Sequence, residues 1–184
     1  MADKLTDTIR FAFSETEYPG DWCLKGSTEG EEPYLVEKEF VGKADWKTLE
    51  AEFIDQAPEG FSSALSFFSD EAFRFYLPAY LIADVQGKLS LADPLFHLTH
   101  GLVDKARSTL INPRRYGSRT WFDAATMKFA MFCREEVEAI VAYLYFKMEI
   151  AEFPPEKDSI AQALNNYWIR RQKEAKPRDE VESG

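Results

Sequence analysis

The feature of this chain that most restricts its fold is an almost entirely apolar stretch that begins with a helix start signal. Ser69 can accept a hydrogen bond from a free backbone N–H at a helix start, and the two acidic residues after it favour the positive end of the helix dipole. From Phe73 onward, apolar side chains would cover nearly every side of the helix. A helix of this kind belongs at the centre of a fold. We therefore expect residues 69–86 to form a central helix against which the other helices pack.

Pro78 lies inside this expected helix. It has no backbone N–H, and its ring would crowd the carbonyl of Arg74. We therefore expect the helix either to kink at Pro78 or to end near Leu77 and begin again. Gly87 is suited to the left-handed conformation that commonly closes a helix, so we expect it to end this one.

A resemblance to a known family rests on this motif, FFSDEAFRFYLPAYL (residues 67–81), and on the segment around Trp46 that precedes it. Together they resemble an uncharacterised family of bacterial proteins known only as a domain of unknown function. The resemblance covers residues 44–150. It implies a small bacterial domain that is mostly helical, with no catalytic residue or cofactor that could be carried over.

The fold class predicted from apolar periodicity is mainly α. Helical spacing of apolar residues marks further helices over residues 5–13, 45–57, 94–102, 137–148 and 160–173. We expect a single domain over residues 1–176, a bundle of about six helices. Residues 20–43 contain glycines, acidic residues and a short Tyr34-Leu35-Val36 run, which predicts a loop-rich segment with at most a small hairpin. The charged residues 177–184 are predicted to be a disordered tail.

Composition limits the classes of function. The 22 basic and 32 acidic residues give a formal net charge of −10, which repels nucleic-acid phosphates and anionic membrane surfaces. No apolar run approaches the roughly 20 residues of a membrane span, and the N-terminus does not look like a secretion signal. We expect a soluble cytoplasmic protein that binds neither nucleic acid nor membrane. Cys23 and Cys133 are expected to be free thiols, with a bridge between them as the alternative.

Asp93, His97 and His100 form the one conceivable set of metal ligands in the sequence. At positions i, i+4 and i+7 they could share one helix face. However, Asp93 is suited to cap the helix that Pro94 begins, and no established zinc pattern is present. The favoured interpretation is two partly buried, hydrogen-bonded histidines, and we predict no cofactor.

Charged and aromatic residues supply three further candidates. Glu71 and Arg74 could form a catalytic pair on the apolar helix, although a structural ion pair, or an arginine that reaches loop carbonyls, is favoured. A basic loop could bind a carboxylate, a phosphate or a partner, or it could neutralise the protein's own acidic surface. Its members are Lys105, Arg107, Arg114, Arg115 and Arg119, of which we single out Arg114, Arg115 and Arg119. An aromatic binding patch could be supplied by Trp46, Trp121, Tyr143, Tyr145, Tyr167 and Trp168, although their helical spacing favours a core position.

Two functions from different classes remain. The sequence has no nucleophile elbow, phosphate-binding loop, dinucleotide fingerprint or Cys-x-x-Cys pair, so an enzyme lacks its usual support. We favour a non-catalytic cytoplasmic domain of antitoxin or immunity type, which binds a protein with a basic surface. The alternative is a small enzyme or a sensor of an anion or metabolite. Its pocket would be lined by the central aromatic residues, and the basic loop or the two histidines would supply polar groups.

Overall fold

The computed structural model describes residues 2–56 and 64–181. Within those ranges the regular structure is helical, with two isolated β-bridges and no β-strand, so the prediction of a mainly α fold is confirmed. The chain divides into two compact units, residues 1–94 and 95–184. The predicted single domain over residues 1–176 stays a prediction.

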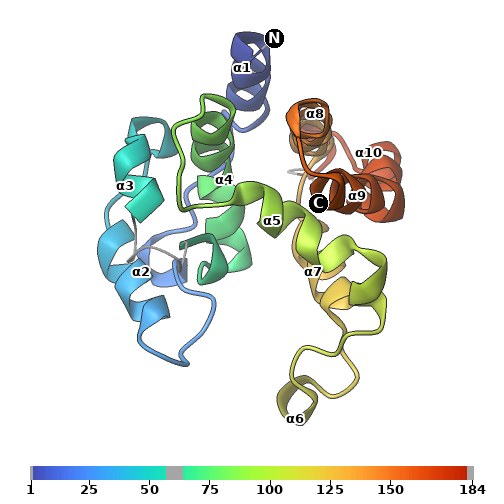
Figure 1. The fold of residues 1–184 in the computed structure, drawn as a ribbon. Coiled ribbons are helices and arrows are strands. Elements are labelled where there is room, and N and C mark those ends of the chain that lie inside the picture. The colour runs from blue at the N-terminus through green and yellow to red at the C-terminus, as the bar shows by residue number, and fades with distance from the viewer. Residues whose placement is uncertain (1, 57–63, 182–184) are drawn as a thin grey trace. The chain divides into compact units, whose positions relative to one another are not determined.

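In its described residues, 2–56 and 64–94, the first unit contains four α-helices and three single-turn 3₁₀ helices. They are α1 (Ala2–Ala12), η1 (Asp21–Cys23), α2 (Glu32–Phe40), η2 (Trp46–Thr48), α3 (Ala51–Gln56), η3 (Ala64–Ser66) and α4 (Asp70–Val85). Helix α4 contacts α1, η2 and α3. In Figure 1, α1 is blue and α4 is green. The apolar stripe predicted near the N-terminus is buried, but α1 ends at Ala12.

Helix α4 corresponds closely to the helix expected at residues 69–86. Ser69 caps it, because its hydroxyl accepts the Ala72 backbone N–H at 3.0 Å. Twelve of its sixteen residues are buried, and the helix continues through Pro78, so the alternative in which it ends near Leu77 is wrong. Gly87 has a φ of 67° and its N–H donates to the Asp84 carbonyl, which confirms the predicted left-handed end. A central position of α4 for the whole chain stays a prediction.

Residues 20–43 differ from the predicted loop-rich segment, because nine of them form α2. Glu31 precedes this helix and Pro33 lies in its first turn, where a missing N–H costs nothing. Pro33, Val36 and Phe40 are buried at positions i, i+3 and i+7, and the Phe40 ring packs against Phe53, Phe68 and Tyr76. The run Tyr34-Leu35-Val36 therefore belongs to a helix, and the strand or hairpin expected there was wrong.

The helix predicted over residues 45–57 is also different, because it is two shorter pieces, η2 and α3. The Asp45 side chain caps the first piece, accepting the Lys47 N–H at 3.0 Å. The Thr48 hydroxyl donates to the Asp45 carbonyl, a local bond that competes with helical hydrogen bonding. Leu49 is then extended, and helix resumes at Ala51. Residue 57 lies outside the described residues.

In the described part of the second unit the regular elements are helices, joined by loops and one isolated β-bridge. Its elements are α5 (Pro94–Thr99), η4 (His100–Leu102), η5 (Asp104–Arg107), α6 (Pro113–Tyr116), α7 (Trp121–Phe129), α8 (Arg134–Ile150), α9 (Pro154–Ala163), η6 (Leu164–Trp168), α10 (Ile169–Glu174) and α11 (Arg178–Val181). Helix α8 contains the predicted segment 137–148. Its first turn is closed by Glu136, whose buried carboxylate accepts the Cys133 N–H at 2.9 Å.

The last long helical segment runs from α9 through a π-helical turn, η6, into α10. The five residues predicted to share its apolar face are all buried: Ile160, Ala163, Leu164, Tyr167 and Trp168. The Trp168 indole N–H donates to the Leu98 carbonyl at 3.0 Å, which ties this segment to α5. Beyond it, α11 lies inside the predicted disordered tail, and the Arg178 N–H donates to Glu135. Residues 182–184 of that tail lie outside the described residues.

Candidate functional site

The net negative charge of the protein lies in one of its two units. Residues 1–94 contain 19 acidic and 8 basic residues, a formal net charge of −11. Residues 95–184 contain 13 acidic and 14 basic residues, a net charge of +1. The excess of negative charge, which would attract a cationic group, therefore lies on the first unit.

Within that unit, the exposed residues of segment 15–41 make up what we call the acidic aromatic surface. The segment holds eight acidic residues against two lysines. Large apolar side chains are exposed among them, led by Trp22, which is 83% exposed, and including Tyr34 and Val41 at 48% and 51%. Large exposed aromatic groups beside charged residues are typical of surfaces that bind proteins.

Hydrogen bonds to Asp21 hold the chain next to Trp22. The Asp21 carboxylate accepts hydrogen bonds from the Tyr18 hydroxyl and, at 2.8 Å, from the Gly42 N–H. The second bond joins η1 to Gly42, the residue that follows Val41. This hydrogen bond therefore links the segment that carries Trp22 to the segment that carries Val41. The Gly42 N–H, followed by Tyr18, lowers the pKa of Asp21, and burial together with Asp21 raises the pKa of Tyr18 to about 12. The carboxylate therefore stays charged and keeps this link at neutral pH.

Helix α2 is held to the same surface by Lys25. The Lys25 ammonium pairs with Glu37, and it lies 5.0 Å from the centre of the Tyr34 ring. Lys25 also forms an isolated antiparallel bridge with Phe68, immediately before α4. The exposed residues of the acidic aromatic surface are thus presented on backbone that is anchored to the core of the first unit.

Cys23 ends η1 beside the start of α4. Its sulfur lies 3.6 Å from the Ser69 hydroxyl and 3.6 Å from a carboxylate oxygen of Glu71. Burial, with Glu71 as a further cause, raises the pKa of the Cys23 thiol, and burial raises that of Cys133 to about 11. Both cysteines are free, as predicted, and both favour the unreactive thiol form.

The structure places the proposed Glu71 and Arg74 pair only partly in the core. Glu71 is exposed and contacts Cys23, whereas Arg74 is partly buried. The expected aromatic residues of α4 fill the core: Tyr76 donates to the Lys43 carbonyl at 2.9 Å, and Tyr80 is completely buried. The pKa values of both phenols are raised, chiefly by burial. Within the described residues the Tyr80 hydroxyl has no hydrogen-bond partner.

The two histidines lie among aromatic rings. The His100 ring stacks on Phe96 at 4.6 Å and meets Trp121 edge-on at 5.4 Å. Burial, with the positive charge of Lys128 as a further cause, lowers the pKa of His97 to about 4. Asp93 is exposed. Across residues 2–56 and 64–181, no three His, Cys, Asp or Glu side chains are grouped as metal ligands would be.

The basic loop forms an exposed projection of the second unit. Its two sides are joined by the bridge between Leu110 and Thr120, and α6 lies at its end, away from α8–α10 in Figure 1. All residues from 112 to 119 are exposed, including the candidates Arg114, Arg115 and Arg119. The guanidinium groups of Arg115 and Arg119 lie 5.1 and 6.0 Å from the centre of the Tyr116 ring. Arg107 lies over Phe122 at 3.8 Å instead.

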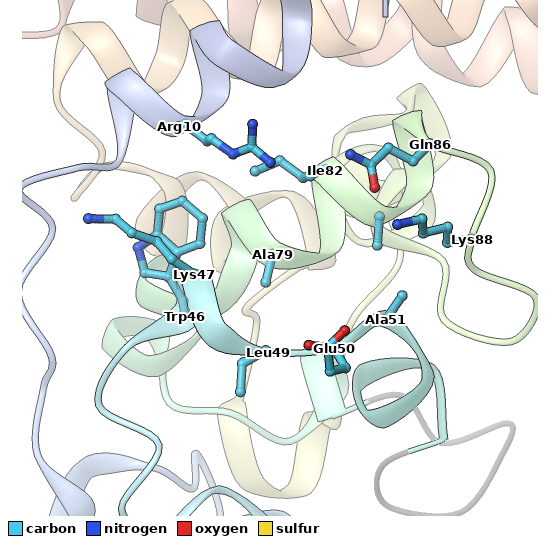
Figure 2. Close-up of a pocket in the computed structure, with 11 residues that line it drawn as sticks. Arg10, Trp46, Lys47, Leu49, Glu50, Ala51, Ala79, Ile82, Gln86 and Lys88 are labelled. Atoms are coloured by element: carbon cyan, nitrogen blue, oxygen red, sulfur yellow. The ribbon is translucent and has the colours of Figure 1, made fainter. Parts of the chain in front are cut away.

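The first unit also has a pocket, on the side of α4 that faces α1 and the η2–α3 segment (Figure 2). It has a volume of about 140 Å³ and is lined by Arg10, Trp46, Lys47, Leu49, Glu50, Ala51, Ala79, Ile82, Ala83, Gln86 and Lys88. Trp46 is its only aromatic residue, so this is not the pocket of central aromatic residues that the sequence suggested.

The sequence interpretation missed Trp22 as a functional candidate. Of the aromatic residues that it named, Trp46, Tyr143, Tyr167 and Trp168 are buried, whereas Trp121 and Tyr145 are about 40% exposed. Trp22 is the most exposed large apolar residue among those described. One signal could have identified it: it follows Gly20 and Asp21 in a turn and belongs to no apolar stripe.

Comparison with known proteins gives a family and no function. The model of a family described as "Family of unknown function (DUF6714)" matches residues 1–172. This confirms the predicted resemblance to a family of unknown function and extends it beyond residues 44–150. None of the curated proteins and none of the solved structures matches the chain. Among the described helices, none is both long enough and apolar enough to cross a membrane.

Proposed function

We propose that this chain, which belongs to the DUF6714 family of unknown function, is a non-catalytic domain that binds another protein through its acidic aromatic surface. The observation that supports the proposal is Trp22, 83% exposed on a turn that hydrogen bonds fix in place. Exposing an indole to water is unfavourable, and burying it against a partner would recover about 2–3 kcal/mol. Tryptophan is accordingly the residue type most enriched at binding hot spots.

The fixed backbone makes this surface suited to tight binding. Association has a cost in side-chain and loop ordering, and a surface that is already ordered avoids part of it. Asp21 links η1 to the end of α2, and Lys25 links α2 to the segment before α4. Trp22 can therefore enter a partner's pocket without rearrangement of the backbone around it.

Charge indicates the kind of partner. The acidic aromatic surface lies on the unit with a net charge of −11, so it would attract a protein with a basic surface and speed the encounter. A role of antitoxin or immunity type, in which an acidic protein masks a basic one, is consistent with this chemistry. We place the complex in the cytoplasm, where free thiols such as Cys23 and Cys133 persist.

The titratable groups of the described chain support binding in preference to catalysis. Both thiols have raised pKa values and His97 has a lowered one, so each is in its neutral form at pH 7. Glu71 near Cys23 and Glu135 near Cys133 raise the pKa of these thiols, so neither cysteine is held as the thiolate that a nucleophile requires. We therefore propose that recognition, and not a reaction, is the function of the acidic aromatic surface.

Site-specific photo-crosslinking in cells of the source organism tests this function. A benzophenone amino acid replaces Trp22 in one strain and Phe153, which is 67% exposed on the second unit, in a control strain. We expect a protein adduct at Trp22 that is absent at Phe153. The captured protein should have a basic surface, and the adduct should be lost when Glu31→Lys and Glu32→Lys are added.

Two results would contradict the proposal. One is an equal yield of adducts at positions 22 and 153, which would mean nonspecific contact. The other is an adduct at position 22 that survives reversal of the two charges, which would remove the proposed electrostatic basis for partner choice.

A further inference from the structure

We propose that the pocket beside α4 is a second binding site, which takes a small organic carboxylate. Its floor is one face of α4, because Ala79, Ile82, Ala83 and Gln86 follow one another at positions i, i+3, i+4 and i+7. The two alanine side chains are too short to fill the space between α4 and the η2–α3 segment. The resulting volume of about 140 Å³ is close to that of an engineered protein cavity, about 150 Å³, that binds benzene.

Three of the polar side chains that line the pocket converge. In Figure 2 the end groups of Arg10, Gln86 and Lys88 point toward one another, while Lys47 points away from them. Among the residues that the structure describes, Arg10 pairs with Asp7 alone, through a long contact of 3.5 Å, and both side chains are more than half exposed. The Lys88 ammonium forms no ion pair with any residue in the described part of the chain. A guanidinium, an amide and an ammonium group are thus available to one ligand.

The charge of this pocket is opposite to that of the unit that contains it. Arg10, Lys47 and Lys88 are three of the eight basic residues among residues 1–94, and the lining contains one acidic residue, Glu50. An anion is therefore favoured inside the pocket and disfavoured over most of the surface around it. Because Glu50 repels a second negative charge, the chemistry favours a monoanion.

A carboxylate with a short apolar chain suits the lining better than a bare anion does. Arg10 can bind both carboxylate oxygens, and Lys88 can neutralise the charge. The apolar chain would lie on Ala79 and Ile82, both nearly buried, and gain from leaving water. This site shares no residue with the acidic aromatic surface. The proposal of a carboxylate site therefore does not depend on the proposed protein partner.

Titration of the whole protein, labelled with ¹⁵N at its tryptophan indoles, tests the site at constant ionic strength. The probes are sodium butyrate, inorganic phosphate and butylammonium chloride. We expect butyrate alone to shift the indole signal of Trp46, with saturation and a dissociation constant of about 1 mM, the range for so small a ligand. Arg10→Gln and Lys88→Gln should each weaken butyrate binding about tenfold.

The matched control is Lys4→Gln, which removes an exposed charge from α1 outside the pocket and should leave butyrate binding unchanged. The inference is overturned if butyrate produces no saturable shift, or if Lys4→Gln weakens it as much as Lys88→Gln does. Equal binding of phosphate or butylammonium would also overturn it, since either result would remove the requirement for a carboxylate joined to an apolar chain.

Discussion

Gly101 shows how a single residue sets the distance between two helices. A Cβ added at Gly101 would lie 2.7 Å from the Cβ of Ala125 in α7, closer than such atoms approach. We expect Gly101→Ala to lower the free energy of unfolding by about 1–3 kcal/mol through overpacking. Urea denaturation measures the loss.

A second substitution identifies the cause of that loss. Ala125→Gly removes the opposing methyl group, so the double variant should be more stable than the sum of the two single effects implies. Strict additivity of the two changes would contradict the close packing of η4 against α7.

His97 gives the protein a specific sensitivity to acid. Its pKa is about 4 in the folded protein and near 6.5 when unfolded, so between these values the unfolded state binds more protons. Stability therefore falls as the pH drops from 6.5 toward 4, by about 2 kcal/mol at pH 5 from this residue alone. The pH dependence of urea unfolding should be correspondingly weaker in His97→Gln. Identical pH profiles for the two proteins would show that His97 does not titrate in this way.

At the level of elements, the strongest prediction concerns Ser69, because its hydroxyl joins η1 to α4. Its hydroxyl accepts the Ala72 N–H at the start of α4 and donates to the carbonyl of Cys23 in η1. We expect Ser69→Ala to lower the free energy of unfolding by about 1–2 kcal/mol. Loosening of η1 should also speed the reaction of the Cys23 thiol with a disulfide reagent.

Ser66→Ala is the control for this change, since Ser66 is exposed and lies just before the same helix. It should alter stability by less than about 0.5 kcal/mol. A thiol reaction rate that is the same in Ser69→Ala and Ser66→Ala would mean that Ser69 does not anchor η1.

Local signals explain which elements the sequence could predict. Helix α4, helix α8 and the segment from α9 to α10 each carry a long apolar pattern with a start or stop residue, so their positions follow from the sequence alone. Helix α2 was missed because only Pro33, Val36 and Phe40 form its apolar stripe. The rings that bury Phe40 belong to residues that follow it by 13 to 36 positions in the sequence. Contacts of that kind cannot be read from local periodicity.

The candidate sites were less predictable than the helices for a related reason. The charge of the chain was plain from the sequence, but the location of its net negative charge in residues 1–94 needed the division into units. The pocket depends on Ala79 and Ala83 facing Arg10 from another helix, which no sequence pattern indicated. The exposure of Trp22 likewise could not be predicted, because it depends on how the chain runs through η1.

For the whole molecule, the uneven distribution of charge predicts how binding responds to salt. A partner attracted by a unit of charge −11 should associate more slowly as ionic strength rises, while its dissociation rate changes little. Stopped-flow mixing with the partner captured at Trp22 measures both rates. An association rate that does not depend on salt would mean that charge does not select the partner.

The affinity of Trp22→Ala for that captured partner tests the central claim most directly, with Phe153→Ala as the control. A hot-spot tryptophan contributes at least about 2 kcal/mol, so the account predicts a dissociation constant raised about 30-fold or more by Trp22→Ala. It predicts no change for Phe153→Ala, which removes an aromatic ring of similar exposure from the other unit. Equal affinities of the two variants would contradict the claim that the acidic aromatic surface is where this protein binds its partner.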